Sequence, residues 1–265
     1  MDFREIIYTK KDHIATITLN RPEARNATTA GMMGEWVEAI EDARLDNDVR
    51  VLVVTGAGTA FCAGADVKGL ASGTLQKTSP AETRNNWRNG SHRIPRALVA
   101  FDKPYIGAIN GPAVGYGMDL ASMCDIRIAS DRARASMGYV RMGVAPGGGG
   151  CYYLPRIIGM ARALELIWTG RWIDAQEMLQ MGYVSRVVPH DELLAATGEL
   201  ASELAKGPPV GIQFAKRLAY RSWDLDLNSF LEMNELVKVI NWTTEDSMEG
   251  PRAWAEKRAP FFKGR

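Results

Sequence analysis

The chain has 265 residues, of which 46% are hydrophobic and 24% charged, which is the composition of an ordinary globular protein with a sizeable core. Its 32 basic and 31 acidic side chains leave a net charge of +1, so no overall field favours nucleic acid or an anionic membrane. No apolar run is long enough to span a bilayer, and the N-terminal segment lacks the apolar core of a signal peptide, so we expect a cytoplasmic protein.

The first half of the chain alternates between strand and helix patterns. Residues 13–19 mix apolar and β-branched side chains and predict a strand. Apolar residues at helical spacing predict a helix over residues 29–44. The continuous apolar run Val51–Thr55 then predicts a strand that is buried on both faces.

The next segments predict a βαβ crossover and then a helical C-terminal part. Residues 105–109 and 126–129 read as strands, with a buried helix over 115–124 between them. Residues 71–90 are polar and predict a mobile loop or a loose helix over a site. Further helices are predicted over 161–169, 174–181, 191–206, 210–221 and 227–241, with a short strand at 184–188.

Three glycine-containing clusters are the candidate sites for chemistry: Phe61–Lys68, Asn110–Asp119 and Met142–Gly150. The first two follow predicted strands, where backbone N–H groups can point into a crevice and form an oxyanion hole. The third contains four consecutive glycines, whose entropic cost indicates a close approach of a helix, a ligand or a subunit. A purely structural role for the glycine turns remains open at this point.

Several other site types are excluded by their missing motifs. Gly115 and Gly117 lack the third glycine of a dinucleotide fingerprint, no Walker-type lysine motif is present, and no histidine pair has metal-ligand spacing. The three cysteines have no CxxC spacing, so we expect small core residues in a reducing compartment. For His92, a surface role is favoured over a role in a site.

Taken together, the clusters resemble the enoyl-CoA hydratase/isomerase (crotonase) family over residues 5–264. The motifs that carry the resemblance are Asn20–Ala27, Ala63–Asp66, Ala108–Gly111, Met123–Ala129, Gly143–Gly150, Thr169–Arg171, Gly182–Val184 and Glu256–Gly264. The resemblance implies an α/β fold with a crotonase-like core of repeated ββα units over residues 1–200, which contains the acyl-CoA site. It also implies a C-terminal helical region over residues 201–265 that packs in a homotrimer or a hexamer.

The resemblance further implies an acyl-CoA substrate, with coenzyme A as part of the substrate, no separate cofactor and no metal. The thioester oxygen would accept hydrogen bonds from the backbone N–H groups of Ala65 and Tyr116, which stabilise the negative charge of an enolate. Coenzyme A would contact Tyr116, Arg25 near its phosphates, and the first glycine cluster through Ala63, Ala65, Asp66, Val67 and Lys68. A reading of Arg25 and Lys68 as ordinary solvated charges stays open.

The chain departs from the family at the acid–base pair. Typical hydratases of the family carry two glutamates, but the matching positions here are Asp119 and Tyr139. The dienoyl-CoA isomerase branch shares the aspartate but keeps a glutamate at the second position and an aspartate where Gly147 stands, so this branch is not assigned. We hypothesise that Asp119 transfers a proton or positions water, while Tyr139, protonated at neutral pH, donates a hydrogen bond or a proton. Arg141 either pairs with Asp119, recognises a polar substrate group or packs on the surface.

The resemblance leaves three functions open. The first is a lyase or isomerase that hydrates, dehydrates or isomerises an unsaturated acyl-CoA, either linear or cyclic. The second is hydrolytic C–C cleavage of a β-oxo acyl-CoA, which the same enolate hole would support. The third is a homologue without catalysis that binds coenzyme A or RNA, although the near-neutral charge and the absence of a basic run count against nucleic acid.

Overall fold

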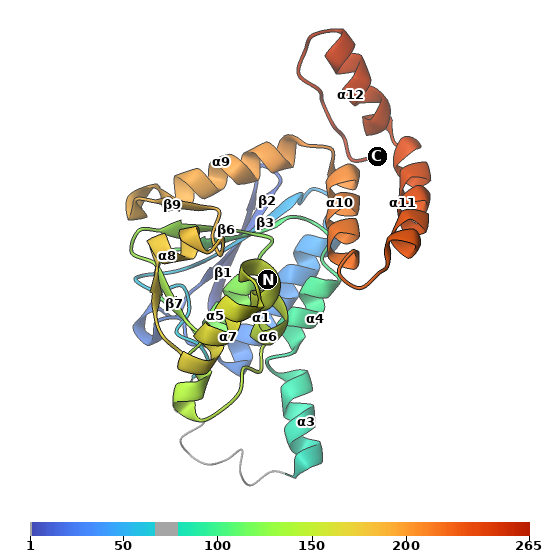
Figure 1. The fold of residues 1–265 in the computed structure, drawn as a ribbon. Coiled ribbons are helices and arrows are strands. Elements are labelled where there is room, and N and C mark those ends of the chain that lie inside the picture. The colour runs from blue at the N-terminus through green and yellow to red at the C-terminus, as the bar shows by residue number, and fades with distance from the viewer. Residues whose placement is uncertain (1, 67–78) are drawn as a thin grey trace.

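A computed structural model describes residues 2–66 and 79–265 of the chain. Its main element is a six-stranded sheet in the order β1-β2-β3-β4-β6-β9 (Figure 1). The pair β1 and β2 is antiparallel, and every later pair in this sheet is parallel. The strands are β1 (Ile6–Lys11), β2 (Ile14–Leu19), β3 (Val51–Gly56), β4 (Tyr105–Ile109), β6 (Ile126–Ser130) and β9 (Arg186–Val188).

A second, smaller sheet lies at the ends of the central strands. It has the order β5-β7-β8 and consists of β5 (Ala113–Val114), β7 (Arg134–Ser136) and β8 (Ile173–Asp174). The isolated bridge between Cys62 and Ala113 connects the segment after β3 to this sheet. The segments that follow β3 and β4 are therefore held side by side.

The described residues form helices on both faces of the main sheet and in a C-terminal arm. They are α1 (Ala30–Leu45), α3 (Pro80–Asn89), α4 (Arg93–Val99), α5 (Tyr116–Ser122), α6 (Gly150–Ile158), α7 (Met160–Thr169), α8 (Ala175–Gln180), α9 (Leu193–Lys206), α10 (Pro209–Arg221), α11 (Leu227–Trp242) and α12 (Glu245–Ala255). On one face α9 packs Ala201 and Ala205 against Val51, Val53 and Ile106. The alternate residues Leu52 and Val54 face the larger core on the other side, together with α1 and α5. Burial on both faces explains why β3 and β4 are uninterrupted apolar runs.

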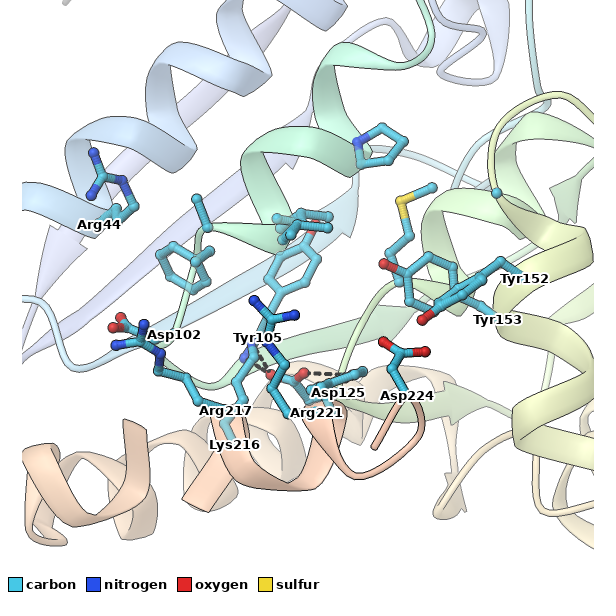
Figure 2. A pocket seen from close by; sticks show the side chains of 18 residues that line it. Arg44, Asp102, Tyr105, Asp125, Tyr152, Tyr153, Lys216, Arg217, Arg221 and Asp224 are labelled. Carbon is cyan, nitrogen blue, oxygen red and sulfur yellow. Dashed lines mark hydrogen bonds and ion pairs between the residues drawn. The ribbon is translucent and has the colours of Figure 1, made fainter. Parts of the chain in front are cut away.

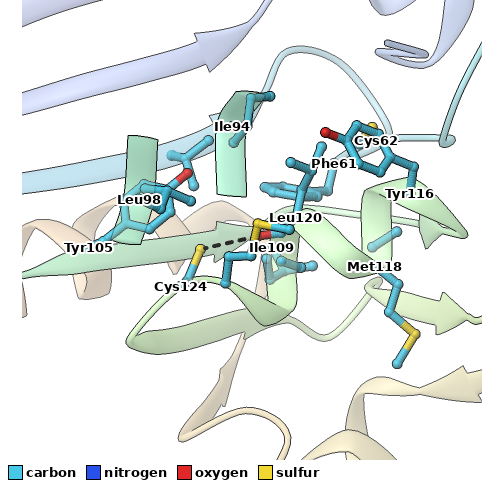
Figure 3. Close-up of a cluster of buried hydrophobic side chains, with 14 of the residues drawn as sticks. Phe61, Cys62, Ile94, Leu98, Tyr105, Ile109, Tyr116, Met118, Leu120 and Cys124 are labelled. Atoms are coloured by element: carbon cyan, nitrogen blue, oxygen red, sulfur yellow. Dashed lines mark hydrogen bonds between the residues drawn. The ribbon is translucent and has the colours of Figure 1, made fainter. Parts of the chain in front are cut away.

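Figure 3 shows part of the larger core, with side chains from the segment after β3 and from α4, β4 and α5. Phe61, Cys62 and Tyr116 meet Met118 and Leu120 of α5 there, and all are buried. The expectation that the cysteines are core residues is confirmed for Cys62 and Cys124. It is wrong for the third one, Cys151, which is exposed on α6.

The sequence-based elements agree with the structure at most positions. The structure contains the four strands predicted in the first half of the chain, as β2, β3, β4 and β6. It also contains the long first helix and the five helices predicted after residue 160. The bounds differ from the predicted ones by a few residues at most. In the polar segment predicted as a loop or a loose helix, residues 80–89 form α3, while residues 71–78 lie outside the described part. Three helices were not predicted separately, because α6 and α12 contain Pro155 and Pro251, and α4 is short and carries Pro95.

The α/β fold class is confirmed, and the C-terminal helices form a distinct arm. Helices α11 and α12 stand away from the sheet in Figure 1, and no side chain of α10 or α11 is fully buried. Residue 200, the predicted boundary of the core, falls inside α9, which contacts the sheet along its length. The division at this point and the role of the arm in a trimer stay predictions. Within the described residues, no helix is long and apolar enough to cross a membrane.

Candidate active site

Two loops at the carboxyl ends of β3 and β4 come into direct contact. The Cys62 carbonyl accepts a 3.0 Å hydrogen bond from the Val114 N–H, next to the bridge between Cys62 and Ala113. Gly64 approaches the second loop so closely that a Cβ on it would lie 2.7 Å from the Val114 carbonyl oxygen and 3.6 Å from the Tyr116 nitrogen. The glycine in the first cluster is therefore required by this contact.

The backbone N–H groups of Ala65 and Tyr116 lie on these two loops. Thr28 makes backbone hydrogen bonds with the two residues that flank Ala65. Its N–H donates to the Gly64 carbonyl (2.8 Å), and its carbonyl accepts from the Asp66 N–H (3.1 Å). The Ala65 N–H itself has no acceptor within residues 2–66 and 79–265. Tyr116 is the first residue of α5, where a backbone N–H has no acceptor inside the helix. The two predicted oxyanion-hole donors thus lie on adjacent segments, and both are available.

Asp119 lies in the first turn of α5, and its side chain is completely buried. Its Oδ2 accepts a hydrogen bond from the Tyr139 hydroxyl (2.6 Å) and another from the Gly148 N–H (2.9 Å). In the described part of the chain, Oδ1 accepts no hydrogen bond of ordinary geometry. Burial raises the pKa of Asp119 to about 7, although the hydrogen bonds from Tyr139 and from the backbone of Gly148 and Gly150 oppose this shift.

Tyr139 lies between the buried carboxylate and the surface. It belongs to the 3-10 helix Gly138–Met142 and keeps some exposed area, whereas Asp119 has none. Burial and the neighbouring Asp119 raise the pKa of Tyr139 far above its ordinary value. The phenol is therefore a proton donor toward Asp119 at neutral pH, and the two residues expected to form the acid–base pair are in direct contact.

The four-glycine run passes over this pair. A Cβ on Gly147 would lie 2.7 Å from the Trp87 ring, and one on Gly148 would lie 2.5 Å from Asp119 Oδ2. Gly150 presses against the same carboxylate from the other side. The close approach expected from the sequence is confirmed, and its partners are the buried Asp119 carboxylate and the partly exposed Trp87 ring.

The phenol of Tyr116 is held away from its own backbone N–H. Its hydroxyl donates a 2.6 Å hydrogen bond to the Ser91 carbonyl, in the link between α3 and α4, and Gly148 covers one side of its ring. Burial raises the pKa of this phenol, so it stays protonated. Tyr116 therefore connects the link between α3 and α4 to the site.

Two residues whose roles the sequence left undecided are now placed. His92 is half-buried, and its Nε2 lies 2.9 Å from the Gly147 carbonyl oxygen, so the surface role favoured from the sequence is wrong. Arg141 is exposed, and the described residues show no ion pair between it and Asp119. The partner of the Asp119 carboxylate is the Tyr139 hydroxyl and not the Arg141 guanidinium.

The candidate CoA-binding residues lie partly in one groove. Arg25 and Ala63 line a groove of about 770 Å³ together with Arg132, Arg134 and Trp172, and Asp131 and Asp174 contribute carboxylates to it.

The Asp66 carboxylate is 3.5 Å from the Arg21 guanidinium. Val67 and Lys68 lie outside the described residues. Arg132 and Arg134 were not among the candidates from the sequence, which has no motif around them.

A separate cavity of about 660 Å³ lies between α4, α6 and α10 (Figure 2). Its floor holds Asp125, which pairs with Lys216 at 2.7 Å and accepts a hydrogen bond from the Tyr220 hydroxyl at 2.9 Å. It adjoins the beginning of β4 at Tyr105, and neither Asp119 nor Tyr116 lines it. The cavity is therefore distinct from the candidate active site. Over residues 2–66 and 79–265, no cluster of side chains has the makeup of a metal site.

The chain is similar to known proteins over its whole length. A model of the enoyl-CoA hydratase/isomerase family matches residues 9–265. A probable enoyl-CoA hydratase of Mycobacterium bovis is 36% identical over 100% of both chains, and the 2,3-dehydroadipyl-CoA hydratase of Escherichia coli is 36% identical over 98% of this chain and 99% of its own. A crystal structure of an enoyl-CoA hydratase from Geobacillus kaustophilus superposes with a TM-score of 0.91, at 35% identity and over 100% of both chains.

Proposed function

The chain belongs to the enoyl-CoA hydratase/isomerase family, and we propose that it catalyses its reaction through an enolate held by two backbone amides and a phenol–carboxylate relay. It is an enzyme that acts on acyl-CoA by hydration or isomerisation, as the family and the hydratase names of its relatives indicate. The proposal concerns the residues that perform this chemistry.

The oxyanion hole consists of the N–H groups of Ala65 and Tyr116. When hydroxide adds to the β-carbon of the double bond, or when a base removes a proton from the α-carbon, negative charge develops on the thioester oxygen. Two fixed N–H dipoles stabilise this charge without reorganising, and such donors lower the barrier most where water is excluded. The lack of other acceptors for both groups within the described residues supports this assignment.

The observation that carries the proposal is the 2.6 Å contact between Tyr139 and Asp119, whose pKa is raised to about 7. Asp119 is buried, so Tyr139 is the member of the pair that reaches the substrate. When the α-carbon of the enolate is protonated, the Tyr139 hydroxyl gives its proton to carbon and receives the proton of Asp119. In the reverse direction Tyr139 accepts the α-proton and passes its own to the Asp119 carboxylate, so no free phenolate forms.

We assign the groove around Arg25 and Ala63 to the CoA moiety. Its guanidinium groups face the charge of the phosphates, and Arg132 and Arg134 add to Arg25. The neighbouring Asp66, together with Val67 and Lys68 beyond it, belongs to the same proposed contact region. No cofactor besides coenzyme A takes part in the proposed reaction. A homotrimer or a hexamer in the cytoplasm also remains part of the proposal.

The relay is tested with Asp119→Asn on a panel of linear and cyclic unsaturated acyl-CoA thioesters, with products identified by mass. For the wild type we expect a gain of one water or an isomer. For the variant we expect kcat to fall about 10²- to 10⁴-fold while thioester binding is retained. The matched control is Asp191→Asn, an exposed aspartate outside the site.

Near-normal turnover by Asp119→Asn would eliminate the relay. Release of a carbon fragment from a β-oxo acyl-CoA, without hydration, would assign the same hole to C–C cleavage instead. Wild-type protein that binds no CoA thioester would refute the proposed function as a whole.

A further inference from the structure

One peptide unit in the glycine run makes hydrogen bonds with both of its polar groups. The Gly147 carbonyl oxygen lies 2.9 Å from His92 Nε2, and the Gly148 N–H lies 2.9 Å from Asp119 Oδ2. These two groups belong to the same peptide bond, so they point in opposite directions. Any rotation of this peptide would change both contacts together.

The two glycines that flank this peptide bond do little to restrict its orientation. Glycine has the widest choice of backbone conformations, and the peptide stands between Gly147 and Gly148, with Gly149 at a φ of +115° just after them. A rotated peptide would turn its carbonyl oxygen toward the Asp119 carboxylate, which repels it. Larger residues at Gly147 or Gly148 are excluded by Trp87 and Asp119, so the chain needs another means of holding the peptide.

We propose that His92 is a positioning residue that holds the Gly147–Gly148 peptide with its N–H directed at Asp119. A carbonyl oxygen only accepts hydrogen bonds, so Nε2 of His92 carries the proton in this contact. The inference rests on the proposed function in that it assigns the acid–base role to Asp119. The hydrogen-bond chain itself is present in the protein without substrate.

His92 is well placed for this task because its own backbone is fixed. Its N–H donates to the Trp87 carbonyl at 3.1 Å, it directly precedes α4, and its ring stands 5.9 Å from the Trp87 ring. The preceding carbonyl, of Ser91, accepts the Tyr116 hydroxyl. The link between α3 and α4 thus holds both the oxyanion-hole residue and the peptide over the carboxylate.

The expected consequence is a change in the proton affinity of Asp119. The Gly148 hydrogen bond lowers the pKa of this carboxyl group, so loss of the peptide's orientation raises it. The titratable groups that face the carboxylate are Tyr139, Tyr116 and Tyr183, with Cys151 at the start of α6. None of these is altered by a change at His92.

The test compares His92→Leu with His92→Gln, whose amide nitrogen can donate in place of Nε2. For His92→Leu we expect kcat to fall about tenfold with KM nearly unchanged, because the acid–base group is displaced. We also expect its ionisation, followed in the kcat–pH profile, to move up by about one unit. His92→Gln should restore both.

A second readout needs no turnover. The protonated-carboxyl infrared band of Asp119, assigned by its loss in Asp119→Asn, should titrate at higher pH in His92→Leu than in the wild type. Equal titration in both proteins, or a Gln variant as impaired as the Leu variant, would overturn the inference even if the enzyme hydrates acyl-CoA. An inactive wild type with the expected infrared shift would instead refute the proposed function and leave the positioning role intact.

Discussion

At the scale of single residues, the site depends on one buried carboxylate. Burial of Asp119 disfavours its ionised form, and the hydrogen bonds from Tyr139 and Gly148 to Oδ2 oppose this only in part, so its pKa rises to about 7. A group with such a pKa can both give and take a proton near neutrality. Asp119 supplies a pKa near neutrality but is buried, and in the proposed relay the hydroxyl of the partly exposed Tyr139 carries the proton between Asp119 and the substrate. Neither residue alone has both the suitable pKa and access to the substrate.

Removal of the Tyr139 hydroxyl tests this division of labour. Tyr139→Phe deletes a hydrogen bond that lowers the pKa of Asp119, so the pKa should rise further above about 7. We expect kcat to fall about 10²-fold or more because the relay is broken, measured together with the pH profile. The control is Tyr220→Phe, which removes a phenol–carboxylate bond to Asp125 in the cavity of Figure 2 and should leave kcat unchanged. Equal rates for wild type and Tyr139→Phe would reduce Tyr139 to a lining residue.

The raised pKa of Asp119 also predicts a pH dependence of folding. The folded state holds this proton more tightly than the unfolded state, because the pKa is about 7 instead of 3.8. The contribution of Asp119 to the free energy of unfolding is fully present below about pH 4 and is lost as the pH rises toward 7. Above about pH 7 this group no longer changes the stability with pH. The contribution that is lost amounts to a few kcal/mol. Urea unfolding of wild type and Asp119→Asn between pH 4 and 8 should therefore show a steeper loss of stability in the wild type. Parallel curves would contradict the buried ionisation.

At the scale of elements, the site is made where short segments cross. The first turn of α5 supplies both a proposed oxyanion-hole N–H and Asp119, since residues 116 and 119 are one turn apart. The glycine run before α6 then covers the carboxylate and donates one hydrogen bond to it. Because the run has no side chains, the backbone itself forms part of the wall of the site.

A single methyl group should therefore disrupt the cover. In Gly148→Ala the new Cβ would lie 2.5 Å from Asp119 Oδ2, so we expect a loss of about 1–3 kcal/mol in stability and a large drop in kcat. Gly198→Ala is the matched control, because a Cβ there meets open space in α9 and should raise stability by up to about 1 kcal/mol. Thermal unfolding and kcat are the measurements. A Gly148→Ala enzyme as stable and active as the wild type would show that the glycine run moves aside freely.

Helices and strands were predictable from the sequence where apolar residues recur at regular spacing. The candidate site was predictable only in part. The buried strands Val51–Gly56 and Tyr105–Ile109 appear as apolar runs, and α5 begins at a glycine turn. The identity of Asp119 and Tyr139 followed from family resemblance, but their burial, and the contact of His92 with Gly147, depend on segments far apart in the chain. No local pattern encodes such a contact, and a half-buried histidine in a polar segment looks like a surface residue.

At the scale of the whole molecule, the sheet and its two helical layers form a closed core, while the C-terminal arm does not. Side chains of α11 that a monomer would normally bury are exposed, including Leu227, Leu236 and Val239. Trp242 at the end of α11, Trp254 of α12 and Phe261 after it are exposed as well. Exposed large apolar side chains are typical of interfaces between proteins, and the homotrimer or hexamer expected from the family stays a prediction.

The assembly is testable through the exposed face of α11. Leu236 and Val239 are 68% and 67% exposed and stand one turn apart, so both project from the same side of the helix. The double variant Leu236→Glu, Val239→Glu would bury two charges in the interface, and sedimentation velocity should show a smaller particle than the wild type. Asn228→Glu adds a charge at an exposed polar position of the same helix and should leave the assembly intact. A wild-type protein that sediments as a monomer would refute the role of the arm, whereas dissociation with retained turnover would show that each active site is complete within one chain.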